Sequence, residues 1–293
     1  MKKFWMILGI LAIPAIALAG YYGYYENNGD WKGNGTQSVR ELVRLQSSLK
    51  RVDNKLRVTS MDYFLDIAEG NVPDHYAVTK FGHNDSVGSS FETIWSGSSI
   101  YSYLDSAQTL FVNGGVNDDV GGTGALTVEL QGLDEDYEPI TDTVTLTGAT
   151  PVETTGSFLR IFRAKVLTAG SLNVNGDDIE IYDDAIGTTL LCQIDAGYGQ
   201  TLMAVWTVPA GVTAYIVRFY SATDAARSTE TNLFVRPFGG AWNVKHNVHH
   251  LDGFFSHTFD IPIAVQEKSD IEVQAMAAGV APAMSAGFTA WYE

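Results

Sequence analysis

The sequence predicts an all-β protein in which two antiparallel, jelly-roll-like β-sandwich domains follow an apolar leader and a short helical stem. From about residue 91 onward, apolar and polar residues alternate in short segments, which is the period of half-buried strands. Turn sequences rich in glycine and aspartate separate these segments. Outside the leader and the stem no long stretch has a helical period, which disfavours a nucleotide-binding fold of alternating strands and helices.

Residues 1–19 form the leader. Lys2 and Lys3 precede an uncharged apolar run that ends in Ala17-Leu18-Ala19, directly before Gly20. Basic residues, an apolar run and small residues at its end are the pattern of an export signal with its cleavage site. We therefore predict a signal peptide. An uncleaved membrane anchor is the alternative, because the run is only slightly shorter than the roughly 17 residues that a membrane-spanning helix needs.

Residues 20–37 are a linker rich in tyrosine and glycine, and residues 38–57 are predicted to form a helical stem. Ser38 can cap this helix, and Glu41 follows at the spacing of a capping box. Apolar residues recur along one side at spacings of three and four: Leu42, Leu45, Leu49, Val52 and Leu56. So narrow a stripe suits a coiled coil between parallel copies, and it predicts a homo-oligomer such as a trimer. An amphipathic helix packed on its own body is the alternative.

Charge is distributed unevenly along the chain. Of 18 basic and 34 acidic residues, the first 57 positions hold 9 and 4, so the remainder holds 9 basic and 30 acidic residues and has a net charge of −21. We predict that this acidic body does not bind nucleic acids, because nucleic-acid binding depends on lysine and arginine contacts with phosphates. The basic stem could instead contact an anionic membrane or the acidic body of another subunit. Cys192 is the only cysteine and is predicted to be buried, so disulfides do not stabilise the body.

The body is predicted to contain a first sandwich domain at residues 58–184 and a second at residues 185–293, because some 200 residues of strand pattern exceed one ordinary sandwich. The predicted strands are residues 126–131, 141–147, 158–167, 179–182, 189–194, 201–208, 213–220, 231–238, 242–248, 256–263, 271–277 and 286–292.

Several stretches of the body resemble a family encoded among the virion structural genes of marine bacteriophages and other aquatic viruses. These stretches are Ile94-Trp95-Ser96-Gly97, residues 101–112, residues 118–125, residues 158–164, residues 197–202, residues 208–215 and residues 235–240. The resemblance covers roughly residues 62–293. It implies a capsid-associated, head-fibre or spike-like component and supplies no catalytic residues. The leader departs from the family, which implies a membrane-containing virus, a host-encoded copy or a surface appendage.

Acidic turns are the candidate metal sites. Asp118 and Asp119, with Asp177 and Asp178, offer the oxygen ligands that Ca²⁺ prefers, although no segment has the EF-hand spacing. Solvated acidic turns without a cofactor are the prediction, and Ca²⁺ bound at these carboxylates is the alternative. The densest histidine group is His246, His249 and His250, with His257 nearby. If this segment is a strand, His246 and His249 lie on opposite faces, which argues against a transition-metal site.

No enzyme is predicted. A hydrolase needs a nucleophile with a base, or two positioned carboxylates. The serine-rich run at residues 96–99 lacks the G-x-S-x-G frame of a nucleophile elbow, and nothing distinguishes one acidic pair among thirty acidic residues. Trp95, Trp206, Trp242 and Trp291 could stack on sugars if they are exposed, but each lies in a strand pattern that favours core packing.

We therefore expect a non-enzymatic virion structural protein, a spike or head-fibre-like surface component with a role in attachment. Its expected partners are copies of itself, other virion proteins or a membrane, and a host-surface glycan. The expected location is the virion surface, reached through the exported or membrane-associated leader. The alternative is a secreted bacterial carbohydrate-binding or filament-forming surface module, and a polysaccharide-degrading enzyme is the third reading.

Overall fold

The computed structural model describes residues 23–25, 31–33, 63–224, 228–279 and 281–293. The chain divides into two units, residues 1–62 and residues 63–293. In the first unit, two short strands pair antiparallel within the segment expected to be a linker: β1 (Gly23–Tyr25) and β2 (Trp31–Gly33). The leader and the stripe Leu42, Leu45, Leu49, Val52 and Leu56 lie outside the described residues. Within the described residues, none of the helices combines the length and the apolar character that crossing a bilayer requires.

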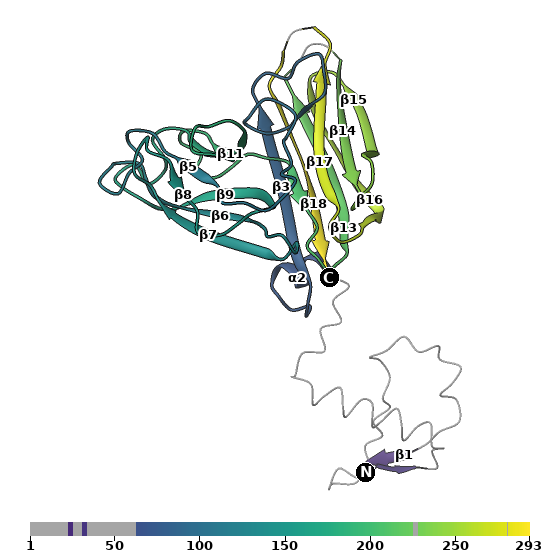
Figure 1. The fold of residues 1–293 in the computed structure, drawn as a ribbon. Helices are drawn as coiled ribbons and strands as arrows, with labels where there is room; N and C mark the ends of the chain where they lie inside the picture. Colours follow the sequence, from purple (N-terminus) through teal and green to yellow (C-terminus); the bar gives the residue numbers. More distant parts are fainter. Residues whose placement is uncertain (1–22, 26–30, 34–62, 225–227, 280) are drawn as a thin grey trace. The chain divides into compact units, whose positions relative to one another are not determined.

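The second unit begins with a short helix and continues as strands. Its elements are α2 (Tyr63–Ala68), β3 (Tyr76–Asn84), β4 (Glu92–Thr93), β5 (Phe111–Asn113), β6 (Ala125–Leu133), β7 (Pro139–Thr145), β8 (Val152–Glu153), β9 (Arg160–Ala169), β10 (Ile179–Tyr182), β11 (Leu190–Ile194), β12 (Val205–Thr207), β13 (Ala214–Thr223), β14 (Thr229–Arg236), β15 (Asn243–His250), β16 (Gly253–Val265), β17 (Asp270–Ala277) and β18 (Met284–Tyr292). Their ladders are antiparallel, which confirms the all-β prediction (Figure 1).

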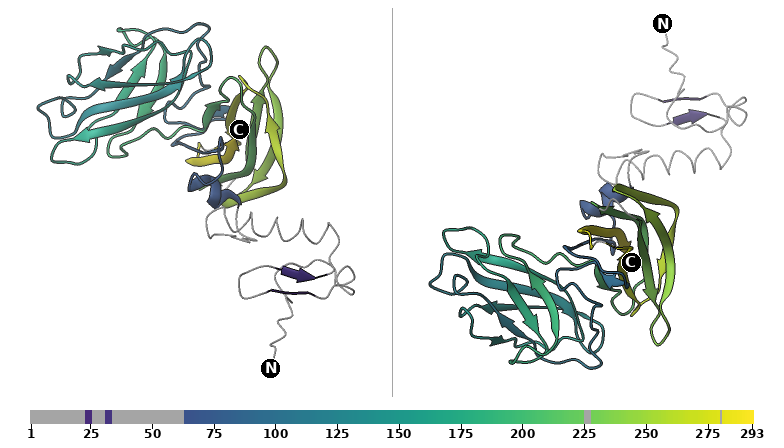
Figure 2. Two further views of the ribbon diagram at one scale, coloured as in Figure 1. Left: turned by 90° about the horizontal axis from the view of Figure 1, so that it is seen from below. Right: turned by 90° about the horizontal axis from the view of Figure 1, so that it is seen from above.

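The strands of this unit form four sheets in the described part of the chain. Two sheets come from the middle of the sequence, with strand orders β11-β10-β5-β8 and β7-β6-β9. The other two have the orders β12-β17-β14-β15, with β4 on β17, and β16-β13-β18-β3. Figure 2 shows the sheets of β5 to β11 lying beside the sheets that contain β13 to β18. We call these two pairs the middle sheets and the terminal sheets.

The arrangement of the sheets is propeller-like, and it corrects the expectation of two separate jelly-roll-like sandwich domains. The expected boundary between residues 184 and 185 does not divide the sheets. β3 precedes it but pairs with β18, and β4 pairs with β17. β11 follows it but pairs with β10. Local periodicity predicts a strand without specifying its partner, and in this body the partners are distant in sequence.

Two clusters of buried apolar side chains form the core. The cluster of the terminal sheets includes Phe219, Leu233, Ile271 and Phe288, all with no exposed surface. The cluster of the middle sheets includes Leu130, Phe158, Ile181 and Leu191, which are equally buried. Each such side chain contributes roughly 1.5–3 kcal/mol through burial. Buried and partly exposed residues alternate along β13, and this alternation is why the sequence pattern predicts a strand there.

Cys192 lies in the middle cluster, as the sequence predicts. Burial raises the pKa of its thiol to about 12. The Sγ atom lies 3.7 Å from the Met203 Sδ atom. This cysteine is therefore a protonated, apolar packing group, since a reactive thiolate needs a lowered pKa.

Backbone contacts join the two terminal sheets to each other, and one buried lysine joins the terminal sheets to the middle sheets. The Ala204 N–H donates to the Ile94 carbonyl over 3.0 Å. Gly82 of β3 lies against the same segment, and a Cβ atom there would stand 1.9 Å from the Ile94 oxygen. The Lys80 ammonium, which is 3% exposed, donates to the Phe162 carbonyl. Burial, assisted by Arg163, lowers the pKa of Lys80 well below its ordinary value.

Candidate functional site

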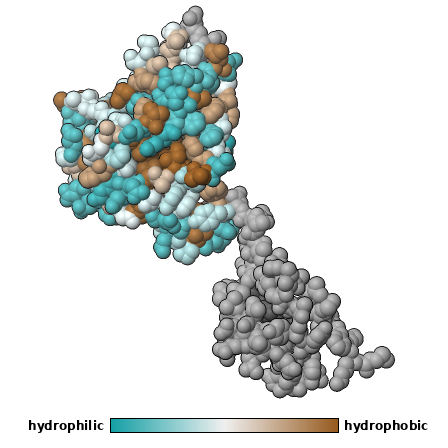
Figure 3. Space-filling view, turned by 90° about the vertical axis from the view of Figure 1, so that its right-hand side faces the viewer, coloured by the Kyte–Doolittle hydropathy of each residue, from teal (hydrophilic) through white to brown (hydrophobic). Residues whose placement is uncertain are grey.

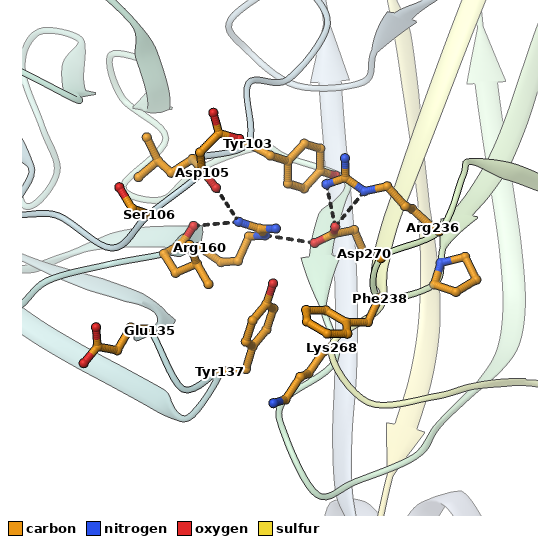
Figure 4. A pocket seen from close by; sticks show the side chains of 15 residues that line it. Tyr103, Asp105, Ser106, Glu135, Tyr137, Arg160, Arg236, Phe238, Lys268 and Asp270 are labelled. Carbon is orange, nitrogen blue, oxygen red and sulfur yellow. Dashed lines mark hydrogen bonds and ion pairs between the residues drawn. The ribbon is translucent and has the colours of Figure 1, made fainter.

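A pocket opens where loops of the middle sheets meet loops of the terminal sheets (Figure 4). Its volume is about 450 Å³, within the range of small-ligand sites. The lining residues are Tyr103, Leu104, Asp105, Ser106, Glu135, Tyr137, Leu159, Arg160, Arg236, Pro237, Phe238, Gly239, Gly240, Lys268 and Asp270. Three of the nine basic residues that follow position 57 are in this set, although the body as a whole is acidic.

Asp270 is the polar centre of the pocket wall. Its Oδ1 atom accepts hydrogen bonds from Arg160 Nε at 2.9 Å and Thr207 Oγ1 at 2.7 Å. Its Oδ2 atom accepts from Arg236 Nε at 2.9 Å and Nη2 at 2.6 Å. Register places these groups, because Arg236 ends β14 directly opposite Asp270, the first residue of β17. Bidentate, charge-assisted contacts of this kind fix side-chain orientation strongly.

Arg160 begins β9 and connects the middle sheets to this carboxylate. Its Nη1 atom donates to the Leu104 and Leu159 carbonyls, each at 2.9 Å. Burial by itself would lower the pKa of the guanidinium, but the charge and hydrogen bond of Asp270 raise it above the ordinary value. Arg160 therefore remains charged although its side chain is only 9% exposed.

Aromatic rings alternate with these cations. The Arg236 guanidinium carbon lies 4.8 Å from the ring centroid of Trp242 and 4.5 Å from that of Tyr103. The Arg160 guanidinium carbon lies 5.1 Å from the ring centroid of Tyr103. One tyrosine ring thus has two guanidinium groups within cation–π range.

The alternation continues toward solvent. Arg160 lies 5.7 Å from the ring centroid of Tyr137, and Lys268 Nζ lies 5.4 Å from the same centroid and 5.6 Å from that of Phe238. We call the series Trp242, Arg236, Tyr103, Arg160, Tyr137, Lys268 and Phe238 the cation–aromatic stack. It joins residues of the middle sheets to residues of the terminal sheets, and its outer end is the exposed ring of Phe238.

Two members of the stack have left-handed backbones. Tyr137 has φ of 65° and Lys268 has φ of 58°, values that non-glycine residues rarely adopt. Hydrogen bonds hold both in place: the Ala210 N–H donates to the Tyr137 carbonyl over 3.0 Å, and the Lys268 N–H donates to the Val208 carbonyl over 2.8 Å. The pocket therefore has a pre-organised wall whose local strain the surrounding structure sustains.

Behind the pocket, Glu272 is buried with hydrogen bonds from three side chains. Tyr103 Oη donates to its Oε2 atom over 3.0 Å, Gln274 Nε2 donates to Oε1 over 2.9 Å, and Thr93 Oγ1 also donates to Oε1. Burial raises the pKa of Glu272, and these hydrogen bonds partly offset that rise. Burial and the nearby carboxylates also raise the pKa of Tyr103 well above its ordinary value. The group fixes Tyr103 within the stack.

Two of the predicted calcium ligands do meet in space. Asp118 Oδ1 accepts from the backbone N–H groups of Ala125 at 2.6 Å and Gly176 at 2.8 Å, and its Oδ2 accepts from the Asp177 N–H at 2.9 Å. Asp177 Oδ2 in turn accepts from the Asn117 N–H at 2.9 Å. These carboxylates stabilise adjoining loops through backbone hydrogen bonds.

The other two predicted calcium ligands have separate partners. Asp119 Oδ1 accepts from the Gly121 N–H at 2.7 Å, and Asp178 Oδ1 accepts from the Ala196 N–H at 2.8 Å. In the part of the chain that the structure describes, no group of three or more histidine, cysteine, aspartate or glutamate residues is placed to hold a metal ion. Calcium binding at these turns stays a prediction.

The histidines singled out in the sequence do not converge on one point. His246 and His257 have ring centroids 5.0 Å apart, His249 Nε2 lies 3.8 Å from a Glu230 carboxylate oxygen, and His250 Nε2 is hydrogen-bonded to a serine hydroxyl. Burial, with the adjacent His257, lowers the pKa of His246, and burial lowers that of His250. Both keep a buried Nδ1 atom without a hydrogen-bond partner among the described residues.

The tryptophans have different environments. Trp95 and Trp206 are buried core residues, as their strand patterns favour. Trp291 stacks on Tyr215 with ring centroids 4.3 Å apart. Trp242 belongs to the cation–aromatic stack instead. The sequence reasoning did not identify the pocket, and its best signal was Arg160, which stands between the apolar residues Leu159 and Ile161.

Comparisons with known proteins give little similarity. The chain matches no family model, and it matches none of the curated proteins. Among solved structures it is similar to that of infectious bursal disease virus, Gx strain, with a TM-score of 0.23, 12% identity, and coverage of 74% of this chain and 71% of that chain. Particles of T=1 symmetry derived from the same virus give a TM-score of 0.22, 9% identity, and coverage of 78% and 74%. TM-scores this low do not establish a shared fold and carry no argument about function.

Proposed function

We propose that this chain is a structural protein of a virus particle, displayed on the particle surface as a spike-like or fibre-like component that attaches to a host. The observation that carries the proposal is the pocket, which loops of both pairs of sheets form on a scaffold of antiparallel strands. Loops held by a rigid scaffold are the usual location of recognition sites. The resemblance of residues 62–293 to virion structural proteins of aquatic viruses supports the same role.

In this proposal the chain binds without catalysing a reaction. Asp270, the buried carboxylate of the pocket, accepts four hydrogen bonds, two of its donor groups being permanently charged guanidinium groups. Both of its oxygens are thus engaged by donors of the chain itself, whereas a general base must be within hydrogen-bond reach of the substrate proton that it takes. The arrangement supports holding a ligand better than transforming one.

In this proposal the predicted stem joins several copies of the chain into an oligomer. Parallel copies joined through Leu42, Leu45 and Leu49 would present several pockets to one host surface, and several linked sites bind more tightly than one. The acidic bodies repel one another, which favours their outward display. The basic stem then contacts the shell or membrane of the particle.

Proteomic and imaging analysis of purified particles tests this role. Particles banded in a density gradient should contain the chain in a constant ratio to the major shell protein, and antibodies against residues 63–293 should label their surface. Pre-immune serum and particles stripped with protease are the controls. If the chain is absent from banded particles and accumulates around uninfected cells, the virion role is wrong.

A second candidate function is a secreted bacterial carbohydrate-binding module. The exposed ring of Phe238, 64% accessible beside a cation, is the specific observation that favours it. Such a module would occur in uninfected bacterial cultures and adhere to polysaccharide there. The particle analysis above therefore distinguishes the two candidates, because each predicts the chain in a different fraction.

A further inference from the structure

Three cations and three carboxylates line the pocket: Arg160, Arg236 and Lys268, with Asp105, Glu135 and Asp270. Both arginines form ion pairs with Asp270. Across the described ranges, Lys268 has no carboxylate partner, and its ammonium lies near the rings of Tyr137 and Phe238. In a body of net charge −21 an unpaired ammonium of this kind marks a place where an anion is favoured at short range.

The outer end of the pocket presents aromatic faces next to this ammonium. Tyr137 and Phe238 have ring centroids 5.7 Å apart and planes at 87°, so they form a corner. Figure 4 shows Lys268 beside Phe238 and Tyr137, with Arg160 and Asp270 deeper in the wall. Phe238 follows Pro237 in a turn closed by a 2.8 Å hydrogen bond from the Gly240 N–H to the Pro237 carbonyl. A fixed loop thus displays the apolar ring of Phe238 to solvent beside the ammonium.

We propose that this pocket binds a carboxylate-bearing saccharide, with the carboxylate against the Lys268 ammonium and the apolar face of the sugar ring against Phe238. The inference rests on the proposed attachment function, since it names the ligand class of the same pocket. Aromatic faces and a cation within one cavity match a ligand that has both a flat ring and a negative charge. A volume of about 450 Å³ suits a small ligand of one or two rings.

The choice between saccharide and other anions follows from geometry. A simple anion would use Lys268 alone and leave the corner of Tyr137 and Phe238 exposed. A phosphate would favour a cluster of free cations, but Arg160 is only 9% exposed and already donates to Asp270 and to two carbonyls. One available ammonium beside an aromatic corner selects a singly charged ring compound instead.

Titration calorimetry with the full chain tests the inference. The probe is a disaccharide that carries a glucuronate residue, and the matched probes are the same disaccharide with glucose in place of glucuronate, and free glutamate. Lys268→Met should weaken glucuronate binding at least about tenfold, because a charge-assisted contact is lost. Phe238→Ala should weaken the glucuronate and glucose probes alike. Both variants change surface side chains, and an unchanged melting temperature verifies that they fold.

Control variants and cell binding make the result decisive. Lys245→Met and Phe254→Ala alter an exposed lysine and an exposed phenylalanine outside the pocket and should bind as the original chain does. Equal affinity for all three probes, or an equal effect of Lys268→Met and Lys245→Met, would overturn the saccharide inference. If Lys268→Met still adsorbs to host cells as the original chain does, the inference fails and attachment stands. If the chain binds glucuronate but neither adsorbs to cells nor occurs in particles, attachment fails and the pocket assignment stands.

Discussion

At the scale of single residues, Asp270 joins two arginines that come from different sheets. Arg160 reaches it from β9 of the middle sheets, and Arg236 reaches it from β14 of the terminal sheets. Its side chain is 5% exposed and that of Arg160 is 9% exposed, so little water screens the interaction between them. A single carboxylate thus fixes both the wall of the candidate pocket and the contact between the two pairs of sheets.

Asp270→Asn removes the charge that compensates these two cations. Breaking a buried ion pair at one partner leaves the other charge uncompensated, so the free energy of unfolding should fall by roughly 3–5 kcal/mol. Denaturant titration measures this free energy of unfolding, provided that its slope against denaturant concentration is the same in the variant and in the original chain. The matched control is Asp136→Asn in an exposed turn, which should shift the free energy of unfolding by less than about 0.5 kcal/mol. Equal losses in the two variants would show that the pair does not stabilise the fold.

Gly82 allows the backbones of the two terminal sheets to approach. Gly82→Ala would place a Cβ atom 1.9 Å from the Ile94 oxygen and 2.6 Å from the Ala204 nitrogen, both backbone atoms that cannot rotate away. We expect a loss of about 1–3 kcal/mol or more in the free energy of unfolding. Gly121→Ala is the control, because the nearest atom to its added Cβ is 3.6 Å away. A thermal melt in which both variants match the original chain would contradict the expected clash.

The residues of the pocket could not be predicted from the sequence. Asp270 begins a strand and Arg160 lies in another strand 110 positions earlier, and no local period connects them. Tyr137 lies between two predicted strands, 126–131 and 141–147, and nothing in its neighbourhood indicates a site. By contrast, the burial of Cys192 followed directly from its apolar neighbours. A residue's burial depends on its local pattern, whereas its partner depends on which strands pair.

At the scale of elements, β15 and β16 follow each other in the chain but belong to different sheets. The face of the body seen in Figure 3 has apolar residues scattered among hydrophilic ones. Val244 is 50% exposed, Phe254 66% and Ile261 86%. Each strand lies at the edge of its sheet, β15 beside β14 and β16 beside β13. Edge strands open locally at lower free energy than central strands, so these two strands should respond first to acid or denaturant.

Acid should weaken the pairing of β15 through its histidines. The pKa of His246 is lowered by burial and by His257, and that of His250 by burial, so the folded state favours their neutral forms. Their contribution to stability is therefore complete above pH ~6.5, the unfolded value, and is lost as pH falls through the lower folded values. The urea midpoint should decrease between pH 7.5 and 5.

The variant His246→Phe tests the origin of that decrease. It removes one titrating group while keeping a ring against Phe255 and Phe259, and the urea midpoint should then depend less on pH. His249→Gln, at a more exposed position on the same strand, is the matched control. If the pH dependence of His246→Phe equals that of the control, the destabilisation originates elsewhere.

Strand positions were more predictable than strand partners. The expected segments 126–131, 213–220, 271–277 and 286–292 correspond to β6, β13, β17 and β18, whose alternation is regular. β3 was not predicted, because its buried Lys80 interrupts the apolar pattern. The helix α2 was also missed, since six residues provide less than two turns of periodicity.

At the scale of the whole molecule, the sequence pattern predicted the all-β fold class, whereas the arrangement of the sheets depends on which strands pair. Alternation in the sequence correctly indicated an all-β body. The grouping into sheets depended on β3 and β4 joining β18 and β17 across most of the body, and such long-range pairing leaves no local signal. The stem and leader remain predictions, because they lie outside the described residues.

Self-association is the prediction that concerns the assembled protein. Replacing Leu45 and Leu49 by aspartate would bury charge in the expected coiled-coil seam, which is strongly unfavourable. We expect light scattering to show oligomers for the mature chain and monomers for this double variant, with unchanged β-sheet circular dichroism. Ser47→Asp with Ser48→Asp adds the same charge off the stripe and should leave the oligomer intact. A monomeric original chain at micromolar concentration would contradict the seam.

The pairing of β3 with β18 also affects how the protein is made. Tyr76 lies opposite Tyr292, so β3 leaves the ribosome roughly 200 residues before its partner, and at about 5–20 residues per second it waits on the order of 10–40 s. Until β18 is made, β3 and β13 each lack the strand that pairs with them in the finished sheet, and unpaired strand edges are sites of aggregation. Nascent chains stalled before Met284 should therefore recruit chaperones that full-length chains have already released.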